Sequence, residues 1–575
     1  MIKQCRFYFI GILLLIACTS SLASQNLEFD ITGLTDDPLK NALKHLQILV
    51  KTAGTLTPTL INQLYQAGPQ EVQESIKPFG FFKSTITHKQ LTHEGNNWVA
   101  HYTINPSEPL RITNINIKIA GPGNQNLKIN KTLVHLPIAP GQIFNVPDYN
   151  KTKNKLLDSA ERQGYIKAKI SNDKILIDLS AYTCIIDLTL DTGTRYYFGP
   201  TFFNPNPLSD KFLQRYVSYQ QGEPFSSQKL LNLQTALSDS GYFESVGVEP
   251  QIEQTKIYQV PIKVTVTPNK RRRYQFGLGY GTITGPRITT GILWRWVNSS
   301  GDKINVNVNW SKVNQNVSAQ YIIPAHNPAT DQYALNAAIY DLNPQHGHAL
   351  VRKIGVSYIS QIERWQRNLS LSYVWETFKI DSDTGTQEAR MVLPNLTYTW
   401  LSTDKFFNLK HGARVTFALE GAYKNLASTV SFIQGQAQFK TVQSFWQNNR
   451  IVLRGNLGYT IIDDSNKLPL SERFYTGGPM SIRGYNEQGI GPGRYITVGS
   501  VEYQRRVIGN WYGAVFYDVG NAFNDFTDYT SNLKRGTGVG IVWLSPIGDV
   551  SLYVAKALNK KGQPISVDIS LGPEL

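Results

Sequence analysis

Two patterns of hydrophobic and polar positions divide the chain. From about residue 27 to 268, short alternating segments are interleaved with stretches whose apolar residues recur every three or four positions. From about residue 270 onward the sequence consists of segments of about ten residues that alternate between apolar and polar side chains. A period near 3.6 predicts helices and a period of two predicts strands. An α+β region is therefore expected before an all-β region.

A Gly-aromatic pattern recurs in the first region at intervals of 84 and 77 residues, which indicates a repeated domain. In the second and third copies the glycine follows a predicted helix, at Asp148–Gln163 and at Ser227–Ser240. Glycine just past a helix end accepts the left-handed conformation that other residues resist. Each copy is predicted to be a β-α-α-β-β unit of about 80 residues. The three copies are Gly80-Phe81-Phe82, Gly164-Tyr165-Ile166 and Gly241-Tyr242-Phe243.

Sixteen alternating segments fit between residues 274 and 572. A globular β-sandwich would show the same period, but two features favour a transmembrane antiparallel β-barrel. The polar positions are mostly Asn, Gln, Ser, Thr and Arg, which suit a wet interior, and Trp and Tyr gather near segment ends, as at Trp294 and Trp400. Because backbone groups need partners in lipid, Tyr274–Gly281 is expected to pair with Ile565–Gly572 and close the barrel.

The N-terminus resembles an export signal. Lys3 and Arg6 precede an apolar stretch, and Ser21-Leu22-Ala23 forms a small-x-small cleavage site, so residues 1–23 are predicted to be a signal peptide. The residues ending at Cys18 also resemble a lipoprotein cleavage box, which leaves a lipidated chain as the alternative. Both interpretations predict export from the cytoplasm.

Composition narrows the class further. The 575 residues carry 57 Lys+Arg against 42 Asp+Glu, and only three cysteines occur, two of them in the first twenty positions. A disulfide framework is excluded, and after the N-terminus no apolar run reaches the ~18 residues of a membrane helix. The basic run at 270–273 is either a solvated turn or a contact with anionic lipid, so a lipid bilayer but no nucleic acid is expected as a partner.

The repeated unit resembles the POTRA (polypeptide-transport-associated) domain, although a tandem of unrelated α+β modules stays open. We therefore expect POTRA domains at 24–105, 106–191 and 192–268, followed by an outer-membrane barrel at 269–575. The longest break between segments, at about 462–495, contains Arg483-Gly484-Tyr485, which resembles the sixth-loop signature of the BamA/TamA superfamily. Phe516-Tyr517-Asp518-Val519-Gly520 is similar to the matching wall motif of that family.

The resemblance implies that the loop folds into the barrel lumen and that Arg483 meets Asp518. A guanidinium in a partly enclosed lumen needs a carboxylate, because an uncompensated buried charge costs several kcal/mol. Gly484 would let the loop approach the wall, where Gly520 removes a side chain. Arg483, Gly484, Tyr485, Asp518 and Gly520 thus form a predicted lock between loop and lumen. The alternative is that the two charges are unrelated surface groups.

Three POTRA copies are typical of TamA-like members of the superfamily. That likeness implies an outer-membrane protein of a Gram-negative bacterium, with periplasmic POTRA domains, that helps insert, fold or translocate unfolded barrel and autotransporter clients. It also implies a TamB-like, inner-membrane-anchored partner, no cofactor, no metal and no enzymatic activity. One departure is the C-terminal Gly572-Pro573-Glu574-Leu575, which lacks the terminal aromatic residue common in outer-membrane barrels.

Glycines near both ends of the predicted barrel suggest a weak lateral seam. The hypothesis is that such an edge templates an incoming client strand. Two alternatives stay open, a two-partner-secretion-type channel and an outer-membrane enzyme, although the sequence contains no Gly-x-Ser-x-Gly, His-Glu-x-x-His or Gly-x-x-x-x-Gly-Lys frame. The predicted seam residues are Phe276, Gly277, Gly279, Gly281, Ile569 and Gly572.

Overall fold

The structure is a computed structural model of the chain. It describes residues 25–572 except 282–284, 312–313, 345–346, 381–384, 403–408, 447, 526, 528–531, 546–547, 561 and 563–564. The predicted signal peptide, Cys18 and Pro573 lie outside the described residues. The chain divides into two compact units: residues up to Gly199 with Gln221–Gln228 and Ile252–Val260 form one, and Pro200–Gln220, Lys229–Gln251 and the residues from Pro261 onward form the other.

The first repeat has the expected β-α-α-β-β order. Its sheet has the order β1-β3-β2, with β1 parallel and β2 antiparallel to the central strand. Leu46 of α1 and Ile61 of α2 are fully buried with Ala100 of β3, because each helix presents an apolar face to the sheet. The elements are β1 (Asn26–Thr32), α1 (Asp36–Ala53), α2 (Pro58–Ile76), β2 (Thr85–Glu94) and β3 (Asn97–Asn105).

The second and third repeats have the same topology, with sheet orders β4-β6-β5 and β7-β9-β8. The second comprises β4 (Arg111–Ala120), α3 (Leu127–Leu133), α4 (Val146–Glu161), β5 (Lys169–Asp178) and β6 (Thr183–Asp191). The third comprises β7 (Tyr197–Phe203), α5 (Asp210–Leu213), α6 (Ser227–Asp239), β8 (Phe243–Pro250) and β9 (Gln259–Pro268). Among the helices that the structure describes, none is long and apolar enough to cross a membrane.

The recurring glycines adopt the left-handed backbone that their position after a helix predicts. Gly80, Gly164 and Gly241 have φ values of +89°, +92° and +75°. At Gly164 an added Cβ would also lie 2.5 Å from the carbonyl oxygen of Tyr196. Glycine is therefore needed there both for its backbone freedom and for space.

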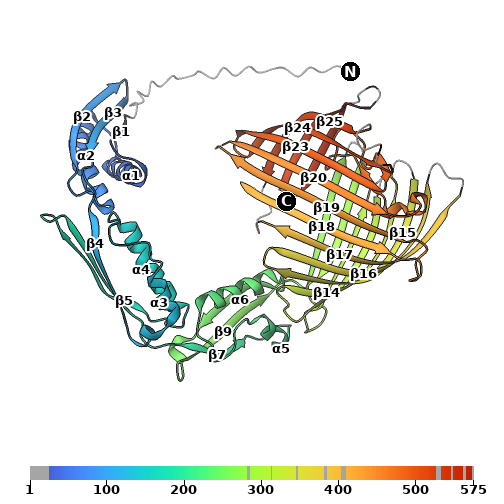
Figure 1. The fold of residues 1–575 in the computed structure, drawn as a ribbon, viewed down its shortest axis with the longest axis horizontal. Helices are drawn as coiled ribbons and strands as arrows, with labels where there is room; N and C mark the ends of the chain where they lie inside the picture. The colour runs from blue at the N-terminus through green and yellow to red at the C-terminus, as the bar shows by residue number, and fades with distance from the viewer. Residues whose placement is uncertain are drawn as a thin grey trace, which may run out of the picture. The chain divides into compact units, whose positions relative to one another are not determined.

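A sixteen-stranded antiparallel sheet forms the barrel, as the segment count predicts. Figure 1 shows β14 to β20 and β23 to β25 side by side along its wall. Its strands are β10 (Arg272–Gly281), β11 (Gly285–Trp294), β12 (Lys303–Trp310), β13 (Asn314–Pro324), β14 (Asp331–Leu342), β15 (Gly347–Ile362), β16 (Trp365–Ile380), β17 (Gln387–Leu401), β18 (His411–Ala422), β19 (Phe432–Phe445), β20 (Asn449–Ile461), β23 (Tyr495–Ile508), β24 (Trp511–Phe523), β25 (Lys534–Ser545), β26 (Gly548–Ala557) and β27 (Ile565–Gly572).

Alternation along the strands separates the two faces of this sheet. On β16, Leu369, Leu371 and Tyr373 are exposed, whereas Ser372 and Val374, at alternate positions, are buried. The same alternation recurs on β18, where Phe417 and Leu419 are exposed. An apolar outer face is what a barrel in lipid requires.

The two ends of the sheet differ from the expectation. Within the described part of the chain, β10 pairs only with β11 and β27 pairs only with β26, so the predicted closing pair between Tyr274–Gly281 and Ile565–Gly572 is not formed there. Residues 271–278 are exposed on both faces. The glycines of β10 offer no side chains for packing across a junction, which weakens pairing at this edge.

The break between β20 and β23 is more ordered than its length suggests. It contains two 3₁₀ turns, η5 (Ser465–Lys467) and η6 (Leu470–Glu472), and a small antiparallel hairpin of β21 (Phe474–Thr476) and β22 (Ile490–Gly493). The sequence predicted that this segment folds into the barrel, but it did not predict the strands β21 and β22.

Candidate functional site

The hairpin between β20 and β23 holds Arg483 against the inner face of the barrel wall. Ile482 and Tyr485, on either side of Arg483 in the chain, pack with Val498 of β23 and Ala557 of β26 in one buried cluster. The side chain of Arg483 is fully buried. An apolar anchor on each side therefore fixes the loop around a buried cation.

Arg483 and Asp518 are brought together by four hydrogen-bonding groups. The backbone N–H and Nε of Arg483 donate to Asp518 Oδ2 at 3.0 Å and 2.8 Å, and Nη2 donates to Oδ1 at 2.8 Å. Ser500 on β23 donates its hydroxyl to the same Oδ1 at 2.6 Å. The two-pronged guanidinium–carboxylate geometry is the strongest that an arginine makes.

Sequence reasoning missed a second carboxylate and an aromatic cage. Glu502 of β23 accepts a hydrogen bond from Nη1 of Arg483, and Tyr553 of β26 donates its hydroxyl to Glu502 at 2.7 Å. The guanidinium carbon lies 3.5 Å from the centre of the Phe516 ring and 4.6 Å from that of Tyr553. Cation–π attraction thus adds to the ion pairs. Ser500 and Glu502 occupy alternate positions of β23 that face the lumen, and this pattern could have identified Glu502 from the sequence.

A second arginine balances the charges of this cluster. Arg454 of β20 lies 3.9 Å from Asp518 Oδ1 and donates to the Ser500 hydroxyl at 3.1 Å. Two guanidinium groups therefore face the two carboxylates of Asp518 and Glu502. Balanced pairing offsets the cost of removing all four charges from water.

Glycines allow the loop to approach the wall, at Gly484 as predicted, but on the wall itself at Gly536 and not at Gly520. A Cβ on Gly536 of β25 would lie 2.1 Å from the carbonyl oxygen of Arg483, and one on Gly484 would lie 2.8 Å from the backbone nitrogen of Ala557. A Cβ on Gly520 would instead meet Thr497 of the neighbouring strand at 2.3 Å. Gly520 therefore makes room within the sheet, and Gly536 makes room for the loop.

The motif also reaches the last strand of the sheet. Gly484 donates its backbone N–H to Asp568 Oδ2 on β27 at 3.4 Å. The left-handed φ of Gly484, +92°, directs this N–H toward the wall. We call Arg483 and Arg454 with Asp518 and Glu502 the arginine cluster. Through Gly484 this cluster is connected to β27, one side of the predicted seam.

A second contact holds the loop at η6, just before the β21–β22 hairpin in the chain. Ser471 of η6 donates its backbone N–H to Glu376 on β16 at 3.1 Å, and its hydroxyl also donates to that carboxylate. Burial and the nearby charges of Glu420 and Glu376 raise the pKa of Glu472 to about 8. The loop therefore carries a carboxyl group whose surroundings favour the protonated form.

The predicted seam residues lie on the two end strands of the sheet. Phe276, Gly277, Gly279 and Gly281 belong to β10, whereas Ile569 and Gly572 belong to β27. Among the residues that the structure describes, the two groups are not paired with each other. Among the described residues, no cluster of three His, Cys, Asp or Glu side chains has the arrangement of a metal site.

Comparison with known proteins agrees with this architecture. Residues 297–572 match the Omp85 superfamily domain, residues 28–106 match the POTRA domain described as TamA domain 1, and residues 196–269 match a POTRA domain described as a surface antigen variable number repeat. The C-terminal part of the chain thus matches an Omp85 superfamily domain, and two stretches before it match POTRA domains. Its barrel lies in the outer membrane and its POTRA domains lie in the periplasm.

Two curated relatives are the outer membrane protein assembly factors BamA of Buchnera aphidicola and of Nitratidesulfovibrio vulgaris. The Buchnera protein is 22% identical over 231 residues, which cover 40% of this chain and 37% of the relative. The Nitratidesulfovibrio protein is 22% identical over 433 residues, which cover 70% of this chain and 54% of the relative. The chain thus spans about half or less of their length. The crystal structure of BamA from Haemophilus ducreyi lacking POTRA domains 1–3 is similar in fold, with a TM-score of 0.63 at 18% identity, covering 80% of this chain and 98% of that one.

Proposed function

We propose that the protein assists the insertion, folding or translocation of outer-membrane barrel proteins, autotransporters included, by templating an incoming strand at the seam between β10 and β27. In this proposal it is the TamA-like outer-membrane component of a translocation and assembly module. The match of residues 28–106 to TamA domain 1 supports that assignment. The names of the curated relatives support the broader role in assembly.

The observation that carries the proposal is the edge of β10. Within the described residues this strand has one hydrogen-bonded neighbour, β11, and its side chains Tyr274, Phe276 and Leu278 are about 70% exposed. An unpaired edge presents a row of N–H and C=O groups that can pair with another chain. Strand addition of this kind gives affinity through the backbone with little demand on client sequence.

The arginine cluster would brace the opposite side of the seam. It connects the loop to β23, β24 and β26, and Gly484 extends the contact to Asp568 on β27. With the C-terminal strands held from inside, β10 would be the edge that moves. In this proposal the contacts of Arg483 hold β27 in place while β10 moves to open the seam.

The POTRA sheets would deliver the client. Each three-stranded sheet has two edge strands, such as β1 and β2 in the first repeat, to which an extended segment can add. A TamB-like periplasmic partner would use one of these edges. No bond is made or broken in such a handover.

A disulfide across the seam tests the proposal. One cysteine is placed at 274–278 and one at 565–569 in the full chain, and the oxidised and reduced forms are compared for insertion of an autotransporter barrel. The control pair, Gly277→Cys with Thr289→Cys, tethers β10 to its registered neighbour β11 and leaves the seam free. Loss of insertion only in the oxidised seam pair supports templating, whereas full activity of that form refutes it.

A further inference from the structure

Two arginines flank a tryptophan on the outward face of the barrel. Arg352 on β15 is in register with Trp375 on β16, and Trp375 is in register with Arg390 on β17. The guanidinium carbons lie 5.0 Å and 5.5 Å from the centre of the Trp375 ring. These three residues are named the cationic row.

The cationic row lies at one boundary of the membrane. Trp365 precedes Trp375 by ten positions on the same face of β16 and is in register with Trp400. Ten residues rise about 34 Å along a strand, which at a tilt of about 45° spans about 24 Å of depth, close to the ~25 Å apolar band between aromatic girdles. Strand direction alternates from β10, which follows the periplasmic POTRA domains, so the Trp375 end of β16 is extracellular.

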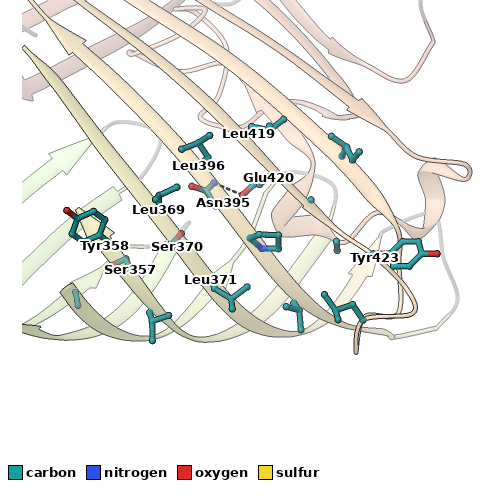
Figure 2. A pocket seen from close by; sticks show the side chains of 18 of the residues that line it. Ser357, Tyr358, Leu369, Ser370, Leu371, Asn395, Leu396, Leu419, Glu420 and Tyr423 are labelled. Atoms are coloured by element: carbon teal, nitrogen blue, oxygen red, sulfur yellow. Dashed lines mark hydrogen bonds between the residues drawn. The ribbon is translucent and has the colours of Figure 1, made fainter. Parts of the chain in front are cut away.

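Apolar side chains fill the rows between these boundaries. Val356, Leu371 and Pro394 are in register, as are Tyr358, Leu369 and Leu396, and with Val392 they line a groove of about 870 Å³. Figure 2 shows Tyr358, Leu369, Leu396 and Leu419 on neighbouring strands of this groove. The nearest of its residues to the cationic row is Val392, two positions after Arg390 on the same face, or about 7 Å along the strand.

The groove forms where two strands separate. Pairing of β17 with β18 ends at Asn395 and Glu420, because Pro394 has no N–H to donate. Beyond that point the segment 423–431 replaces β18: Thr429 donates its N–H to the Arg390 carbonyl at 2.8 Å, and Ser428 accepts from the Val392 N–H at 3.0 Å. Residues of this segment, Tyr423 and Leu426, complete the groove.

Among the described residues, the ion pairs bring one carboxylate to the cationic row, that of Glu388 at 3.8 Å from Arg390, so these residues leave the row with a net positive charge. Asp341 on β14, also toward the extracellular end, is held by His348 at 3.0 Å. An arginine at the membrane boundary lies at the level of the lipid headgroups, and its planar fork matches a phosphate.

We infer that the cationic row and the groove together bind one phosphate-bearing lipid of the extracellular leaflet. The phosphate lies between Arg352 and Arg390 beside Trp375, and an acyl chain lies in the groove. From Trp375 to Leu369 on β16 is six residues, or about 20 Å along the strand. At the tilt of about 45° this distance corresponds to about 14 Å of membrane depth. That depth is about half of a ~30 Å hydrocarbon core, which suits a lipid of one leaflet.

Native mass spectrometry of the full chain in detergent tests this inference. Phosphatidylglycerol and phosphatidylcholine with identical acyl chains are added separately, and inorganic phosphate is added in a third sample. Wild-type protein is expected to retain one phosphatidylglycerol at least fivefold more tightly than phosphatidylcholine. Because the acyl chain contributes, phosphate alone is not expected to compete at equal concentration.

Variants locate the site. Arg352→Gln with Arg390→Gln should lower phosphatidylglycerol retention at least fivefold, while the charge-matched control Arg505→Gln with Arg506→Gln, at the other end of the wall on β23, should not. Equal retention of the two lipids by wild-type protein overturns the inference, even if the double variant fails to fold. Unchanged binding in a folded double variant, or occupation of the groove by a second copy of the chain seen as a dimer, also overturns it.

Discussion

Replacing Gly536 by alanine should undock the loop from the barrel wall. The added Cβ would lie 2.1 Å from the carbonyl oxygen of Arg483, where ordinary contacts begin at 3.4 Å, so the loop must move by about 1.3 Å. The 2.8 Å hydrogen bonds from Arg483 to Asp518 would lengthen to about 4 Å and break. Breaking a buried ion pair costs about 3–5 kcal/mol, which raises the undocked fraction roughly 100-fold or more.

Trypsin measures this change directly, because the bond after Arg483 is protected while that side chain is buried. Gly536→Ala is expected to be cleaved after Arg483 much faster than the wild-type protein under native conditions. Gly499→Ala on β23 is the matched control, since the nearest atom to its Cβ is 4.0 Å away. Equal cleavage of the two variants would show that close packing at Gly536 does not hold the loop.

Three further predictions follow from particular contacts. Arg483→Lys keeps the charge but loses the two-pronged contact with Asp518. Tryptic cleavage at position 483 should therefore increase, and the temperature at which the barrel unfolds, read from gel mobility, should fall. Unchanged cleavage and unfolding temperature would contradict this role of the contact. The docked loop holds the pKa of Glu472 near 8, above its usual 4.5, so docking is accompanied by uptake of a proton. Docking should therefore weaken as the pH rises from about 4.5 to about 8. In the same cleavage assay, Glu472→Gln should flatten this pH dependence. Gly164→Ala should destabilise the second POTRA domain by about 1–3 kcal/mol, because φ is +92° and the Cβ would clash with Tyr196, and faster hydrogen exchange around Tyr165 would reveal it.

Local patterns predict much of the architecture. The period-two alternation from residue 274 onward predicts sixteen strands because an outer face in lipid and a wet inner face impose opposite demands on successive residues. The Gly80, Gly164 and Gly241 repeats predict where helices end, because left-handed backbone is a local property. Both signals are contained within a few neighbouring residues.

Contacts between distant segments were harder to predict. Glu502, Tyr553 and Arg454 surround Arg483 only because strand register brings β20, β23 and β26 beneath the loop. Gly536 has no motif of its own, and its importance depends on where the Arg483 carbonyl lies. The closing pair of the barrel was expected from the general need to satisfy backbone groups in lipid, but pairing at one particular junction depends on the packing that glycine-rich β10 lacks.

Photo-crosslinking from the edge of β10 tests the central proposal most directly. A photoreactive residue at Phe276 is compared in living cells with one at Phe439, an outward-facing position on β19 that is paired on both sides. The proposal predicts that an autotransporter barrel arrested during assembly crosslinks through its terminal strand to position 276 and not to position 439. Equal crosslinking at the two positions, or none at 276 while the client still assembles, would contradict it.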